Sequence, residues 1–119
     1  LWFDPRGLLW IQTDISTSAM NRGDYANLGN NMMLAADVAT GETRRFLVGP
    51  AGCEVTGVVM TPDLTTMFVD IQHPGESPSE RADPDRPKAT SSWPDGPSGG
   101  RPRSATIVVR RRDRGIVGS

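Results

Sequence analysis

Short apolar segments bounded by glycine and proline constrain the fold of this chain more than any other feature. The 119 residues include 13 glycines and 10 prolines, a share that favours turns and short strands over long helices. Six segments of six or seven residues are rich in β-branched, aromatic and other apolar side chains, as expected of strands, and they are 8–13, 32–38, 43–48, 55–60, 66–71 and 105–110. The pattern predicts an all-β fold of antiparallel sheets.

The turn residues between these segments predict two β-hairpins. Segments 32–38 and 43–48 flank the sequence "ATGE", in which Gly41 suits a position of positive φ. Segments 55–60 and 66–71 flank the sequence "TPDLT", in which Pro62 suits a turn position. Each pair is therefore expected to form neighbouring antiparallel strands.

A weak internal repeat organises the strands further. The segment beginning at Pro5 aligns with the segment beginning at Pro62, roughly 57 residues later, and the matched pairs are Pro5 with Pro62, Leu9 with Met67, Trp10 with Phe68 and Ile11 with Val69. Repeats of this kind are typical of four-stranded propeller blades. The second copy has a strand before its turn, whereas nothing precedes Leu1 in the first copy. We therefore expect about one and a half blades of a β-propeller, as the C-terminal part of a longer protein, with the first blade lacking its opening strand.

Charge and composition limit the classes of partner. The net charge of −1 predicts no general attraction to nucleic acid, and no apolar run of about 18 residues exists that would insert into a membrane.

Residues 74–103 form a Pro-rich stretch that is predicted to be an irregular insertion. From Arg101 onward the chain carries six arginines and one aspartate. A non-catalytic propeller that binds partners through the Pro-rich loop and this basic end is one functional hypothesis.

Two carboxylates stand where a propeller would hold a metal ion. Glu54 precedes segment 55–60, which would be the innermost strand of its blade, so its side chain is expected at the mouth of the central channel. Carboxylates from several blades can meet there and bind hard cations such as calcium. Asp14 ends segment 8–13 and aligns in the repeat with Gln72, which makes it a second candidate ligand. The alternative for Glu54 is an ordinary solvent-exposed glutamate before a strand.

Cys53 and His73 are predicted at the same end of the second hairpin as Glu54. Cys53 could act as a nucleophile only with a base nearby, or it could bind a metal as a thiolate. A cysteine beside a strand is more often a small buried apolar residue. His73 is either a functional group or a hydrogen-bonded residue at a strand exit. Pro74 favours an extended backbone at His73.

Several motifs together resemble the C-terminal part of the bacterial PhoX-type alkaline phosphatases. The motifs are "LLWIQTD", "GNNMMLAADVATGETRRFLVGPAGCEVTG", "TPDLTTMFVDIQHPGE", "WPDG" and "GRPRSATIVVRRRD", in this order. The resemblance implies a six-bladed propeller, phosphomonoesterase activity, a cofactor of iron and calcium ions, and export to the periplasm or beyond by the twin-arginine route. It also implies that Glu54, and less directly Asp14, contribute to the metal site, and that this part alone is inactive without the upstream blades of the same chain.

One departure from the family pattern bears on local structure. The turn "PDLTT" has Leu64 where relatives carry a glycine. Leucine is poorly suited to positive φ, so a different type of turn is expected there.

Overall fold

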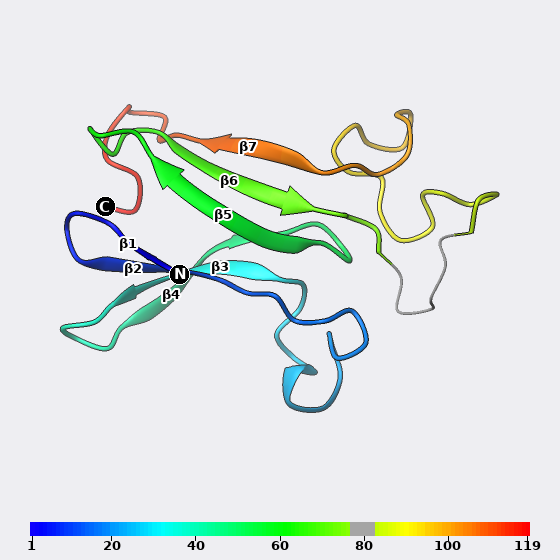
Figure 1. Ribbon diagram of the computed structural model, residues 1–119, viewed down its shortest axis with the longest axis horizontal. Coiled ribbons are helices and arrows are strands. Elements are labelled where there is room, and N and C mark those ends of the chain that lie inside the picture. Colours follow the sequence, from blue (N-terminus) through cyan, green and yellow to red (C-terminus); the bar gives the residue numbers. More distant parts are fainter. Residues whose placement is uncertain (77–82) are drawn as a thin grey trace.

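The computed structural model describes residues 1–76 and 83–119, and within them two antiparallel β-sheets pack against each other (Figure 1). The four strands of the first sheet follow the chain order, and they are β1 (Trp2–Phe3), β2 (Leu8–Gln12), β3 (Met32–Asp37) and β4 (Thr43–Val48). The second sheet contains β5 (Glu54–Met60), β6 (Met67–Gln72) and β7 (Ala105–Val109). A single 3-10 turn, η1 (Gly23–Tyr25), lies between β2 and β3. The predicted all-β, antiparallel architecture is confirmed.

The six predicted strands are all present, and their ends differ from the prediction by no more than one residue. Both hairpins are confirmed, because β3 pairs with β4 and β5 pairs with β6 in antiparallel register. Gly41 has a φ of 74°, as its place in the first turn requires. Turn chemistry and strand composition were sufficient to locate these elements.

The first sheet does have an opening strand, so the expectation that it lacks one is wrong. Trp2 pairs with Trp10 and Phe3 pairs with Leu9 across β1 and β2. The backbone N–H of Asp4 donates to the carbonyl of Leu8 at 3.0 Å and closes the turn between the strands. Two residues are too few to show the alternation by which a strand is recognised in a sequence.

The core lies between the two sheets and is centred on Trp10, which is completely buried. Its ring meets Phe46 edge to face, with centroids 4.8 Å apart. Around it lie fully buried side chains from both sheets and from the C-terminal segment, namely Met33, Cys53, Val55, Met67, Val69, Ile71 and Val117. These side chains hold the two sheets together by apolar contact.

The repeat in the sequence corresponds to equivalent faces of the two sheets. Trp10 points from β2 toward the second sheet, whereas Met67 and Val69 point from β6 toward the first. Phe68 lies between those two residues, so its side chain points away from the first sheet. Trp10 and Phe68 thus occupy equivalent positions in successive blades, each directed toward the blade that would follow.

An apolar row on the outer face of the second sheet follows from this arrangement. Val59 and Val108 are paired with Phe68 on either side of β6. The two valines are 58% and 55% exposed. In a propeller this face is covered by the next blade.

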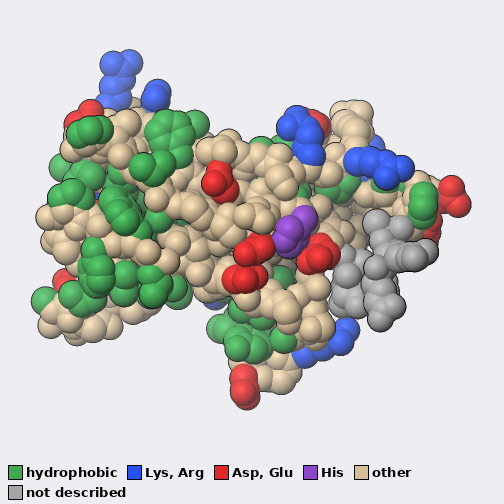
Figure 2. All heavy atoms as spheres, in the orientation of Figure 1, with side chains coloured by type: hydrophobic (Ala, Val, Ile, Leu, Met, Phe, Trp, Pro, Cys, Tyr) green, Lys and Arg blue, Asp and Glu red, His purple; other side chains and the backbone are tan. Residues whose placement is uncertain are grey.

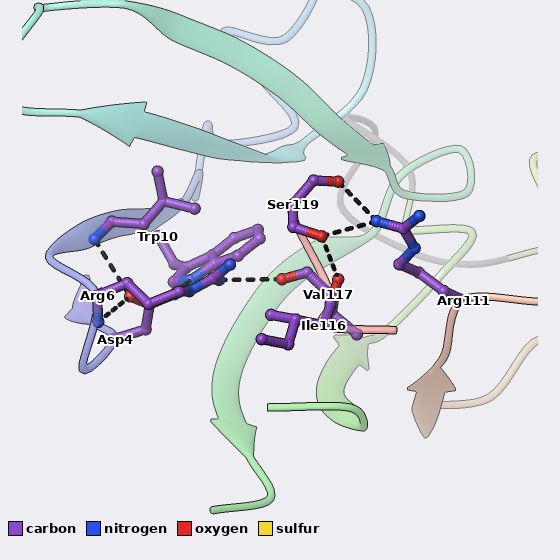
Figure 3. Close-up of polar contacts among 8 residues, drawn as sticks. Asp4, Arg6, Trp10, Arg111, Ile116, Val117 and Ser119 are labelled. Carbon is purple, nitrogen blue, oxygen red and sulfur yellow. Dashed lines mark hydrogen bonds and ion pairs between the residues drawn. The ribbon is translucent and has the colours of Figure 1, made fainter. Parts of the chain in front are cut away.

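The C-terminal segment joins the turns of the two sheets (Figure 3). The buried carboxylate of Asp4 accepts hydrogen bonds from the backbone of Arg6 at 2.8 Å and from the Trp10 indole at 3.2 Å, and it pairs with the Arg6 guanidinium. Arg6 also donates to the carbonyl of Val117 at 3.0 Å, and the Val117 N–H donates to Leu64 at 2.9 Å. Burial opposes ionisation of Asp4, but the hydrogen bonds from Arg6 and Trp10 outweigh it and lower its pKa.

Leu64 adopts the positive φ that a glycine would adopt at this turn position, so the predicted change of turn type is wrong. Leu64 has a φ of 59°, a conformation that costs a leucine free energy. Its side chain is buried, and Asp63 supports the turn by accepting hydrogen bonds from the hydroxyl and backbone of Thr65 and from the hydroxyl of Thr61. Burial of the apolar side chain and these bonds offset the strain.

The Pro-rich insertion lies partly within residues 77–82, which fall outside the described residues. The described part, 83–104, has no strand and extends beyond the ends of β6 and β7 (Figure 1). The Lys88 ammonium donates to the carbonyl of Pro97 at 2.7 Å, and Arg103 pairs with Asp95 at 3.0 Å.

Candidate functional site

Glu54 is the first residue of β5 and forms the centre of a polar cluster at one end of the second sheet. Its carboxylate lies 3.1 Å from Nε2 of His73, and its side chain is 22% exposed. The other ring nitrogen of His73 lies 3.4 Å from the carboxylate of Glu76. Figure 2 shows the histidine on the molecular surface between acidic groups. The predicted proximity of Glu54 and His73 is confirmed.

The backbone of His73 differs from the expectation. Its φ is 30° rather than extended, so the influence of Pro74 is overridden. The N–H of His73 donates to the Ser104 hydroxyl at 2.9 Å, and the N–H of Gly75 donates to the carbonyl of Ala51 at 2.8 Å. These bonds to two distant segments fix the turn after β6 and orient the ring toward Glu54.

Asn31 connects the two candidate ligands through the backbone. Its side-chain oxygen accepts hydrogen bonds from the Thr13 hydroxyl at 2.9 Å and from the N–H of Ile15 at 2.7 Å, on either side of Asp14. Its amide nitrogen donates to the carbonyls of Ile15 at 2.9 Å and of Cys53 at 3.0 Å. Asn31 is 1% exposed. The residue therefore holds the segment of Asp14 and the residue before Glu54 at the same end of the structure.

Asn31 could not be singled out from the sequence, since adjacent asparagines are common turn residues. All four of its side-chain hydrogen bonds join residues 16 to 22 positions away, which only the fold brings close. The position directly before a buried strand is the one feature that hinted at more than a turn. A buried amide with all of its donors and acceptors engaged fixes local geometry strongly.

Asp14 is exposed, and no described contact joins its carboxylate to Glu54. Among the described residues, no three His, Cys, Asp or Glu side chains are arranged to hold a metal ion. Asp14 as a ligand stays a prediction. Glu54 and His73 present oxygen and nitrogen donors to the surface, which suits a hard cation or iron as part of a larger ligand set.

Cys53 faces away from this cluster and into the core. It is 1% exposed, and a β-carbon at Gly49 would collide with its sulfur. Burial, followed by the negative charge of Glu54, raises its pKa to about 11. A protonated, enclosed thiol is neither a nucleophile nor a metal ligand, so Cys53 packs the core.

Cys53 is therefore expected to resist thiol reagents in the folded protein. With a pKa of about 11, only about one thiol in a thousand is ionised at pH 8, and the sulfur is enclosed. Labelling by a maleimide or by a disulfide reagent should be slower than in the urea-unfolded chain by a factor of about a hundred or more. Labelling in the folded state at the rate of a free peptide thiol would contradict the burial of Cys53.

Comparisons with known proteins agree with the all-β fold described above. The family model of alkaline phosphatase PhoX matches residues 1–75. A comparison with curated proteins found no match. Among solved structures, the chain is similar to Pseudomonas fluorescens PhoX in complex with vanadate, a transition state analogue, with a TM-score of 0.79 and 50% sequence identity. The match covers 98% of this chain and 18% of that one. A family match over more than half of the chain, with agreement in sequence and fold, shows that the chain belongs to the PhoX alkaline phosphatase family.

Proposed function

We propose that this chain is the C-terminal part of a metal-dependent phosphomonoesterase and contributes Glu54 to its channel metal site. The observation that carries the proposal is the position of Glu54: it begins the inner strand of a blade, its carboxylate is partly exposed at the sheet end, and His73 holds it there. The solved relative is a complex with vanadate, a transition state analogue. A site for a phosphate-like oxyanion in the whole protein is consistent with that complex.

Each residue of the cluster has a distinct role in this proposal. Glu54 supplies a negatively charged oxygen ligand, and Asn31 fixes the backbone before it through the Cys53 carbonyl. His73 orients the carboxylate through its Nε2 contact at 3.1 Å. Asp14 is proposed as a further ligand held by the same Asn31 network. Calcium and iron ions, when bound, neutralise phosphate charge and activate an oxygen nucleophile.

The chain alone does not supply a complete site under this proposal. Its described residues contain no three-residue metal group, and the chain spans 18% of the length of the solved relative. We propose that upstream blades of the same polypeptide provide the remaining ligands and cover the outer row of Val59, Phe68 and Val108. The isolated chain is accordingly expected to be inactive.

We place the whole protein in the periplasm or outside the cell, as family membership suggests. Among the described residues, no helix has the length and apolar character needed to cross a bilayer.

The proposal is tested by measuring phosphate release from a generic phosphomonoester. The purified protein that includes the upstream blades should release phosphate when loaded with calcium and iron. Treatment with a chelator should abolish the activity, and the two metals together should restore it. A metal-loaded, folded protein that releases no phosphate would contradict the enzyme and favour the non-catalytic binding module.

A further inference from the structure

A cavity of about 450 Å³ opens at the end of the second sheet opposite Glu54. Its lining residues are Thr65 and Thr66, from the turn before β6, together with Arg110 and Arg114, which follow β7. Glu54 pairs with Gln72 at the other end of β5 and β6. The cavity is therefore separate from the candidate metal site by the length of the sheet.

The wall of this cavity is basic and rich in hydrogen-bond donors. The Nε of Arg110 donates to the Thr66 hydroxyl at 3.0 Å, which anchors the guanidinium, and its two terminal nitrogens have no hydrogen-bond partner among the described residues. Thr66 is 5% exposed, and its own hydroxyl proton can be donated as well. The Arg114 N–H bonds to the carbonyl of Arg111 at 3.1 Å and fixes the backbone of the second arginine.

No carboxylate of the described residues neutralises these two arginines. The nearby aspartate, Asp113, is paired with Arg111, and Asp63 accepts its hydrogen bonds from Thr61 and Thr65. Arg110 and Arg114 both line this cavity and carry like charges, so an anion bound between them would relieve their repulsion. Planar guanidinium groups match the oxygens of phosphate, to which they donate paired hydrogen bonds.

We propose that Arg110, Arg114 and Thr66 form a binding site for a phosphate group, carried by inorganic phosphate or by a small phosphomonoester. The inference does not depend on the proposed catalytic activity, because none of these residues belongs to the cluster around Glu54. The cavity has room for a phosphate group with several waters, since a water occupies about 30 Å³.

The test measures phosphate binding at the two arginine side chains directly. In NMR spectra of the purified protein labelled with nitrogen-15, the Nε–H signals of Arg110 and Arg114 should shift saturably as inorganic phosphate replaces chloride at constant ionic strength. Arg110→Gln and, separately, Arg114→Gln should each weaken binding at the remaining arginine by about tenfold or more, since each removes charged hydrogen bonds. Arg114→Gln spares the contact with Thr66, so loss of that contact cannot explain its effect.

The matched control is Arg112→Gln. Arg112 carries the same charge in the same segment but does not line the cavity, and its loss should change the affinity by less than about twofold. Equal weakening by the control would show a general charge effect and overturn the site. Acetate binding as tightly as phosphate would overturn the phosphate assignment. Phenyl phosphate is titrated in parallel, and tighter binding than inorganic phosphate would identify the phosphomonoester as the form bound.

Discussion

Replacing Glu54 with glutamine is expected to lower phosphomonoesterase turnover in the metal-loaded protein by about a hundredfold or more. Glutamine keeps the size of the side chain and can still hydrogen-bond to His73, but it removes the negative charge. Loss of a residue that only supports a metal ligand already costs about 10- to 100-fold, so loss of a ligand is expected at or beyond the upper end. Turnover and bound metal are measured on the same preparations.

Two controls separate the metal ligand from a general acidic residue. Glu42→Gln removes an exposed carboxylate in the β3–β4 turn that pairs with Arg44, and activity should not change. Glu76→Gln removes the other acidic neighbour of His73 and should have an effect smaller than about tenfold. Wild-type turnover and metal content in Glu54→Gln would contradict the assignment of Glu54 as a ligand.

Truncation of Trp10 to alanine is expected to lower the free energy of unfolding by about 3–5 kcal/mol. The ring fills the centre of the contact between the two sheets, and its indole N–H is one donor to the buried Asp4 carboxylate. Denaturant unfolding followed by circular dichroism gives the change without relying on tryptophan fluorescence.

Val108→Ala is the matched surface control for Trp10→Ala. Val108 lies on the outer face of the second sheet and is 55% exposed, so its truncation should cost less than about 1 kcal/mol in the isolated chain. In the protein with all blades present, the same change should cost more, because the next blade would cover this face. A Trp10→Ala loss no larger than that of Val108→Ala in the isolated chain would contradict the two-sheet core.

The strands were predictable because their sequence signals are local. Gly41 and Pro62 mark the hairpin turns, and β-branched and aromatic residues fill the segments between turns. The sequence repeat also predicted a structural equivalence, since Trp10 and Phe68 lie on equivalent faces of the two sheets. β1 was not predicted because two residues show no periodicity. The turn at Leu64 was predicted wrongly because burial of its side chain and the hydrogen bonds around Asp63 offset the strain of its positive φ.

The candidate site was predictable only in part. Glu54 and His73 could be placed together because the start of the first strand of a hairpin lies beside the end of its second strand. The backbone of His73 depends on Ser104, 31 residues away, and the role of Asn31 depends on partners up to 22 residues away. Such contacts exist only after the sheets pack, so neither composition nor spacing reveals them. The inward direction of Cys53 likewise follows from strand alternation once Val55 is known to be buried beside it.

Anomalous diffraction from crystals of the metal-loaded protein with its upstream blades tests the central claim most directly. We expect an iron or calcium ion at about 2.0–2.6 Å from a carboxylate oxygen of Glu54. The same maps show whether Asp14 is also a ligand. Ions bound elsewhere in the channel, with Glu54 still held by His73 and out of reach of any metal, would contradict the account.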